Sequence, residues 1–156
     1  MLWVFEDKDS DMCARECMRT VQALSLEEAK TIADGAEKKA IQLGVKIAIA
    51  IVDEHGNLKL YRRMDGNNVV SVEMSQLKAK TSASIPLSTQ ALAEKNAALA
   101  NKPYLGIPGL VLLEGGLPIF APDGQHVGAI GVSGATPEID GICAAAGLSS
   151  LQSTGL

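Results

Sequence analysis

The segment Arg62–Gly66 combines side chains that could bind an anionic ligand. It places two guanidinium groups, a thioether and a carboxylate side by side at the expected end of a strand. Guanidinium groups match the geometry of carboxylates and phosphates, so this set could present cations to an anion. The alternative is a group of salt bridges that ends the strand. Lys78 and Thr81 are three residues apart on one face of an expected helix, and they could join the same pocket.

Glycines occupy every third position from Gly128 to Gly134. A dinucleotide-binding fingerprint needs the spacing G-x-G-x-x-G at the start of a helix, whereas this segment has G-x-x-G-x-x-G inside an expected strand. Glycine inside a strand marks a bulge or the close approach of a ligand or another backbone, and both interpretations stay open. Pro118, shortly after Gly115 and Gly116, indicates an edge or bulged strand beside an opening. The candidate ligand-binding residues are therefore Arg63, Met64, Asp65, Lys78, Thr81, Gly115, Gly116 and Gly131.

The histidines and cysteines do not predict a zinc site or a nucleophile. His55 and His126 each lie beside an expected turn, where a solvated histidine is more common than a ligand or a base. Cys13 and Cys17 are one helical turn apart, but no second pair of ligands stands near them in the sequence. Reduced thiols in a cytosolic protein are the preferred interpretation. The sequence offers no paired acid and base, so we expect no independent catalysis.

Length and composition indicate a single globular domain. The chain has 156 residues, of which 47% are hydrophobic and 21% charged, which argues against disorder. Its net charge is −4 and its basic residues are scattered, so we expect no nucleic-acid partner. The sequence has no run of 18 apolar residues and no cationic leader, so we expect a cytoplasmic protein without a membrane contact.

The elements that must position these residues are predicted by periodicity and by helix caps. The motif Ser25-Leu-Glu-Glu28 is a capping box, and an apolar face at helical spacing follows it as far as Gly44. The apolar run 46–53, a turn and the run 58–64 predict an antiparallel hairpin. Helices are expected over 70–82 and 89–101, with Pro86 between them.

The last third of the chain is predicted to be mostly strand. We expect strands at 110–113, 117–120 and 126–132, and a final helix at 136–146 with Thr136 as its cap. The order is helix, two strands, helices, three strands, helix, which predicts an α+β fold with an antiparallel sheet. The domain is expected to span 24–150. Residues 1–23 are expected to form a mobile or partner-docking extension, with a short helix over 11–21, and residues 151–156 a tail.

Five segments together resemble the GlcG/HbpS-like family, the haem-degrading domain also found at the C-terminus of PduO-type corrinoid adenosyltransferases. The resemblance covers about Leu24 to Leu148. The matching segments are Val52-Asp53 with Gly56-Asn57-Leu58, Arg63–Gly66, Lys78-Ala79 with Thr81, Gly115–Ile119, and Val127–Gly134 followed by Asp140.

The resemblance implies a five-stranded antiparallel sheet packed with helices, a homo-oligomer, and a haem or other tetrapyrrole ligand. A tetrapyrrole needs an apolar slot, cations for its propionates and an axial ligand. Arg62, Arg63 and Lys78 could supply the cations. The candidate axial ligands are His55, Met64, Met74 and His126. The alternative is an accessory protein of a corrinoid-dependent (propanediol or glycerol) or glycolate pathway that binds cobalamin or a small acid.

Overall fold

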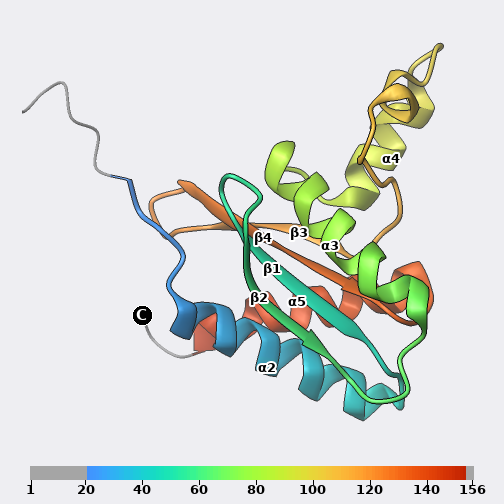
Figure 1. The fold of residues 1–156 in the computed structure, drawn as a ribbon. Coiled ribbons are helices and arrows are strands. Elements are labelled where there is room, and N and C mark those ends of the chain that lie inside the picture. The colour runs from blue at the N-terminus through green and yellow to red at the C-terminus, as the bar shows by residue number, and fades with distance from the viewer. Residues whose placement is uncertain (1–20, 154–156) are drawn as a thin grey trace, which may run out of the picture.

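The structure, a computed structural model, describes residues 21–153 of the chain. Its elements are α2 (Leu26–Leu43), β1 (Ala48–Asp53), β2 (Leu58–Arg63), α3 (Val69–Ser84), α4 (Thr89–Ala98), the 3-10 turn η1 (Pro103–Gly106), β3 (Gly116–Phe120), β4 (His126–Ser133) and α5 (Pro137–Ser153) (Figure 1). The predicted helix over 11–21 lies outside the described residues except for Val21, which is not helical, and so does most of the predicted extension. Helix α5 runs further than predicted and takes in residues 151–153 of the expected tail.

Helix α2 begins and ends where its sequence signals place it. The Ser25 hydroxyl accepts a hydrogen bond from the Glu28 amide at 3.1 Å, and the Glu28 carboxylate accepts one from the Ser25 amide at 2.7 Å. Gly44 ends the helix in the left-handed conformation, with φ of 68°. The predicted capping box and the predicted C-terminal glycine are both confirmed, because each satisfies backbone groups that the helix ends leave free.

The sheet is antiparallel, and within residues 21–153 it has four strands in the order β2-β1-β4-β3. The prediction of five strands was therefore wrong. The run 110–113 is irregular, and the amide of Val111 donates to the Thr81 hydroxyl at 3.0 Å instead of to a neighbouring strand. A side chain of α3 thus satisfies a backbone group that the prediction had assigned to the sheet. The α+β class and the predicted hairpin of β1 and β2 are confirmed.

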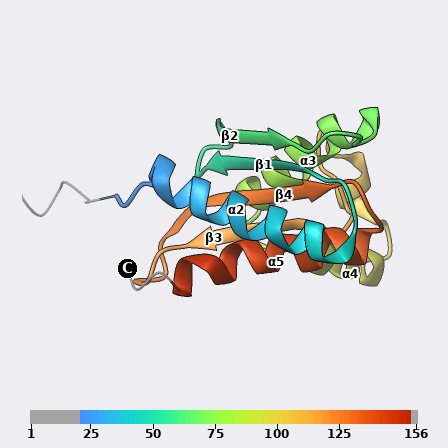
Figure 2. The ribbon, with the colours of Figure 1, turned by 90° about the horizontal axis from the view of Figure 1, so that it is seen from below.

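One face of the sheet carries the main hydrophobic core. Helices α2 and α5 lie side by side across this face (Figure 2). Ile49 and Ile51 of β1 meet Ile130 and Val132 of β4 beneath the two helices, and all four side chains are fully buried. The alternation follows from the strand period of two, because each strand sends every second side chain to this face.

The other face is covered by α3, which approaches the strands very closely. Small side chains meet there: Ala50 and Ala129 of the sheet pack against Ala79 of α3. A Cβ atom on Gly131 would overlap the Ser75 carbonyl oxygen and the Ala79 amide of α3. Helix packing is thus one reason for glycine in β4, in agreement with one of the two interpretations of that segment.

Helix α4 and η1 extend away from the sheet beyond α3 (Figure 1). Asn96 of α4 is buried, and its side-chain oxygen accepts a hydrogen bond from the Tyr104 amide at 3.1 Å, which ties η1 to the helix.

Among the helices of residues 21–153, none combines the length and the apolar character that crossing a membrane requires.

Candidate functional site

Helix α3 turns a polar face toward the sheet. Its buried polar side chains are Ser71, Ser75, Lys78, Thr81 and Ser82. Polar side chains on the inner face of a helix are costly to bury unless they form hydrogen bonds. Burying this face therefore costs free energy unless its side chains find hydrogen-bond partners. The contacts of these side chains show which elements they connect.

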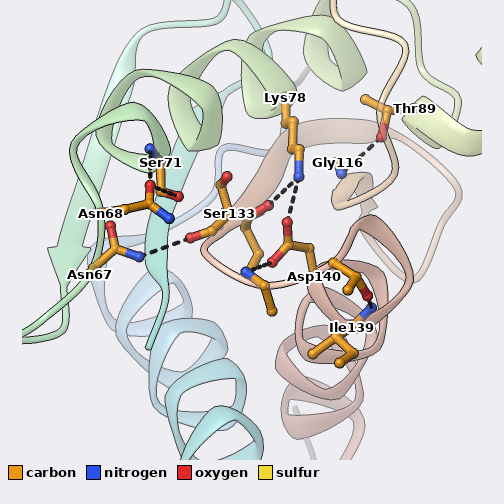
Figure 3. Close-up of polar contacts among 12 residues, drawn as sticks. Asn67, Asn68, Ser71, Lys78, Thr89, Gly116, Ser133, Ile139 and Asp140 are labelled. Carbon is orange, nitrogen blue, oxygen red and sulfur yellow. Dashed lines mark hydrogen bonds and ion pairs between the residues drawn. The ribbon is translucent and has the colours of Figure 1, made fainter. Parts of the chain in front are cut away.

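Lys78 is the centre of this polar face. Its ammonium donates to the Asp140 carboxylate at 2.7 Å and to the Val132 carbonyl at 3.0 Å (Figure 3). Both side chains of the ion pair are only 3% exposed. The other carboxylate oxygen of Asp140 accepts a hydrogen bond from the Ala135 amide at 3.0 Å. Burial raises the pKa of Asp140, while the hydrogen bond and the charge of Lys78 act in the opposite direction.

Gly115 and Gly116 bring the chain alongside this ion pair. A Cβ atom on Gly115 would lie 2.8 Å from the Lys78 ammonium nitrogen, and its φ of 125° is one that glycine adopts readily. The Gly115 carbonyl accepts a hydrogen bond from the Val132 amide at 2.8 Å. The Gly116 amide donates to the Thr89 hydroxyl at 3.0 Å. The two glycines therefore join α3, α4 and β4 at one point.

A hollow opens on the outer side of α3, where the chain returns from η1. Its volume is about 540 Å³, a size typical of small-molecule pockets. The lining is mainly apolar and includes Leu77, Lys80, Thr81, Ile85, Ile107 and Leu110. The Thr81 hydroxyl donates to the Leu77 carbonyl at 2.8 Å and accepts from the Val111 amide, so it fixes one wall of the hollow to the other. Exposed Lys80 adds a cation to this lining.

A second hollow of about 490 Å³ lies at the opposite end of the sheet, beside the turn between β3 and β4. Leu24, Phe120 and Leu151 line it, and Glu28 is its charged side chain. A carboxylate at the rim repels an anionic ligand, whereas the ammonium of Lys80 attracts one. For a ligand with carboxylate groups, the hollow beside α3 is the better match.

The predicted set around Arg63 is divided by the structure. Met64 packs into the main core, on the opposite side of the sheet from α3. Arg63 is exposed and donates to the Asn67 carbonyl at 3.0 Å, and Asp65 is exposed as well. Arg62 binds Glu37 of α2 at 2.6 Å. These four residues do not line the hollow beside α3.

The candidate metal ligands also lie apart from each other. His55 is exposed on the turn after β1, with its ring 3.6 Å from the Glu54 carboxylate. The ring of His126 stacks edge-on against Phe120 at a centroid distance of 5.6 Å, and its Nε2 atom is buried without a partner in the described part of the chain. Met74 is half-buried on α3, one turn before Leu77. Residues 21–153 contain no cluster of three or more His, Cys, Asp or Glu suited to a metal.

Of the predicted ligand-binding residues, the structure brings Lys78, Gly115 and Gly116 together, and Gly131 lies beneath the same helix. Thr81 instead lines the hollow. Sequence reasoning missed the partner of Lys78, because Asp140 is 62 residues away along the chain. It also missed the lining residues Lys80, Ile107 and Leu110. The apolar run around Leu110 was visible in the sequence, but its pattern indicated a strand.

The fold defines a small α+β protein with helices on both faces of an antiparallel sheet. The family model described as "Haem degrading protein HbpS-like" matches residues 24–149. The protein GlcG of Escherichia coli is 34% identical over 118 residues, which are 74% of this chain and 85% of GlcG. The chain therefore belongs to the HbpS-like family.

Two solved structures show the same fold. A double mutant of HbpS from Streptomyces reticuli is 34% identical, with a TM-score of 0.78 over 86% of this chain and 90% of its own. The complex of PduOC with haem is 29% identical, with a TM-score of 0.74 over 83% of this chain and 95% of its own. One of the two similar structures thus holds haem by its own description.

Proposed function

We propose that this protein binds haem or a related tetrapyrrole in the hollow between α3 and the segment after η1. The proposal rests on the size and chemistry of the hollow. It has a volume of about 540 Å³ and a mainly apolar lining, to which Lys80 adds one ammonium group. Membership of the HbpS-like family and the likeness to a PduOC–haem complex support the same ligand class. No catalytic turnover is part of the proposal.

The residues of the hollow fit part of such a ligand. Leu77, Ile107 and Leu110 would contact a flat apolar macrocycle, and Lys80 would pair with a propionate. The Thr81 hydroxyl already forms hydrogen bonds with the Leu77 carbonyl and the Val111 amide. Its role is therefore to connect the walls of the hollow and not to bind iron. The candidate axial ligands His55, Met64, Met74 and His126 are not part of this lining. Bound haem iron would supply redox chemistry or gas binding.

The alternative function is that of an accessory protein in a corrinoid-dependent pathway. Its ligand would then be cobalamin or a small acid. A corrin carries many amide side chains and a nucleotide loop, which need polar partners when buried. The lining offers mostly hydrocarbon and one ammonium group. A porphyrin with two carboxylates matches that chemistry better, and titration with hydroxocobalamin beside haemin separates the two.

We also propose that the protein is a homo-oligomer. Large apolar side chains are exposed on and beside η1: Leu105 is 69% exposed and Ile107 46%. Exposed apolar patches of this kind are typical of protein interfaces. A second copy of the chain is the proposed partner, and it would cover the arm formed by α4 and η1.

Haemin titration tests the proposed ligand. Purified protein at micromolar concentration should shift the Soret band of haemin and saturate at one haemin per chain. Ile107→Glu, which puts a carboxylate into the hollow, should weaken binding by tenfold or more, about 1.4 kcal/mol. Leu58→Glu is the matched control, because Leu58 is a similarly exposed apolar residue on the edge strand β2. An equal effect of both variants would contradict the proposed location.

A further inference from the structure

We propose that Lys78 is a positioning residue that holds both walls of the ligand-binding hollow in place through its ion pair with Asp140. This inference rests on the proposed function, because it assigns a role to residues behind that same site. Lys78 itself does not line the hollow. It acts through α3 and through the segment that ends at Gly115.

The first wall of the hollow is α3, which has few apolar contacts with the sheet. In the small core on that side, the side chains of α3 are Ala79 and Ala83. Alanine offers little buried apolar surface, so these contacts contribute little hydrophobic free energy to holding α3 on the sheet. The ion pair of Lys78 with Asp140 at 2.7 Å joins α3 directly to α5 and fixes the register between them.

The second wall is the segment from Ile107 to Val111, which runs on to Gly115. The Lys78 ammonium also donates to the Val132 carbonyl at 3.0 Å, while the Val132 amide donates to the Gly115 carbonyl at 2.8 Å. Gly115 lies directly against the ammonium group. Both α3 and the end of the second wall are therefore held at the Lys78 ammonium group.

The choice of charged groups at this position supports positioning over simple space filling. A buried ion pair pays a large desolvation cost, and apolar side chains of similar volume often stabilise a fold equally well. Apolar side chains, however, cannot form hydrogen bonds that fix the orientation of one element relative to another. The Lys78 and Asp140 side chains make three directed hydrogen bonds to α5, β4 and the turn between them.

The test compares Lys78→Met with the double variant Lys78→Met/Asp140→Leu. The single variant leaves a buried carboxylate unpaired and should lower both the urea midpoint and haemin affinity. The double variant removes both charges, so its urea midpoint should recover most of the loss seen in the single variant. The rest of the loss reflects the Val132 carbonyl and the Ala135 amide, which lose a partner. The haemin affinity of the double variant should still fall about tenfold. Affinity that recovers together with stability would overturn the proposal.

Amide exchange gives a readout that needs no ligand. In the double variant, the Val111 amide should exchange about tenfold faster than in the wild type, relative to the amides of the β1–β4 ladder. Unchanged Val111 exchange would overturn the positioning role. A wild-type protein that binds no haemin would refute the proposed function, and the Val111 amide would then decide the positioning role alone.

Two further variants complete the design. Asp140→Asn keeps the shape of the side chain but weakens the ion pair, so it should also speed exchange at Val111 if the double variant does not fold. Arg62→Met is the matched control, because it removes an ion pair with Glu37 on the opposite face of the sheet. It should leave both Val111 exchange and haemin affinity unchanged.

Discussion

Substitution of Gly116 by alanine should destabilise the protein strongly, although it adds a single methyl group. The new Cβ atom would lie 2.6 Å from the Lys78 carbonyl oxygen, 2.6 Å from the Thr89 methyl carbon and 2.9 Å from the Ser82 hydroxyl. Ordinary contacts begin at 3.4 Å, so the shortfall against the α3 backbone is 0.8 Å. Either α3 or β3 must move, and the hydrogen bond from the Gly116 amide to Thr89 would be strained.

The expected loss follows from the cost of overpacking a well-packed interior, which is about 1–3 kcal/mol. Because one of the three neighbours is helix backbone, we expect a value of about 3 kcal/mol. With a urea m-value of about 2 kcal/mol/M, the unfolding midpoint should fall by about 1.5 M. Circular dichroism at 222 nm against urea measures this midpoint directly.

Gly106→Ala is the matched control for this measurement. A Cβ atom at Gly106 would meet no atom within 4 Å, and its φ is not positive. Its free energy of unfolding should stay within about 0.5 kcal/mol of the wild-type value, as is usual for surface changes. If Gly116→Ala were as stable as Gly106→Ala, the close approach of α3 to the sheet would be refuted.

Three further predictions concern helix α2, the turn after β1 and the proposed assembly. Ser25→Ala removes the hydroxyl of the capping box and should cost about 1 kcal/mol in urea unfolding; an unchanged midpoint would show that the cap contributes nothing. Burial opposes ionisation of Asp53, but hydrogen bonds from Asn57 and the His55 amide hold its pKa below the ordinary value. Because the folded-state pKa is lowered, this stabilisation is present at neutral pH and is lost as the pH falls below about 4. The gap in stability between wild type and Asp53→Asn should therefore shrink in acid, and a constant gap would contradict it. Leu105→Glu should lower the mass measured by analytical ultracentrifugation if the arm forms the oligomer interface, and an unchanged assembly would exclude that surface.

Much of the fold could be predicted because its signals are local. The capping box at Ser25, the glycine at position 44 and the apolar run of β1 each act within a few residues. The strand predicted at 110–113 is absent because of a contact that is distant in sequence. That run is apolar enough for a strand, but Thr81, some 30 residues earlier, takes the hydrogen bond of Val111.

The site was harder to predict because its contacts are distant in sequence. The pairing of Lys78 with Asp140 depends on how α3 and α5 meet across the end of β4. The pattern of α3 was misleading as well, since its polar face is buried while Val69 and Val70 are exposed. A rule that places polar residues outside and apolar residues inside does not describe this helix, because its buried face holds both serines and alanines.

Haemin binding to the purified full chain is the most direct test of the central claim. We predict a saturable shift of the Soret band with one haemin per chain, and a smaller response to hydroxocobalamin. Ile107→Glu should weaken the haemin response tenfold or more, and Leu58→Glu should preserve it. A haemin spectrum that micromolar protein leaves unchanged would contradict the account.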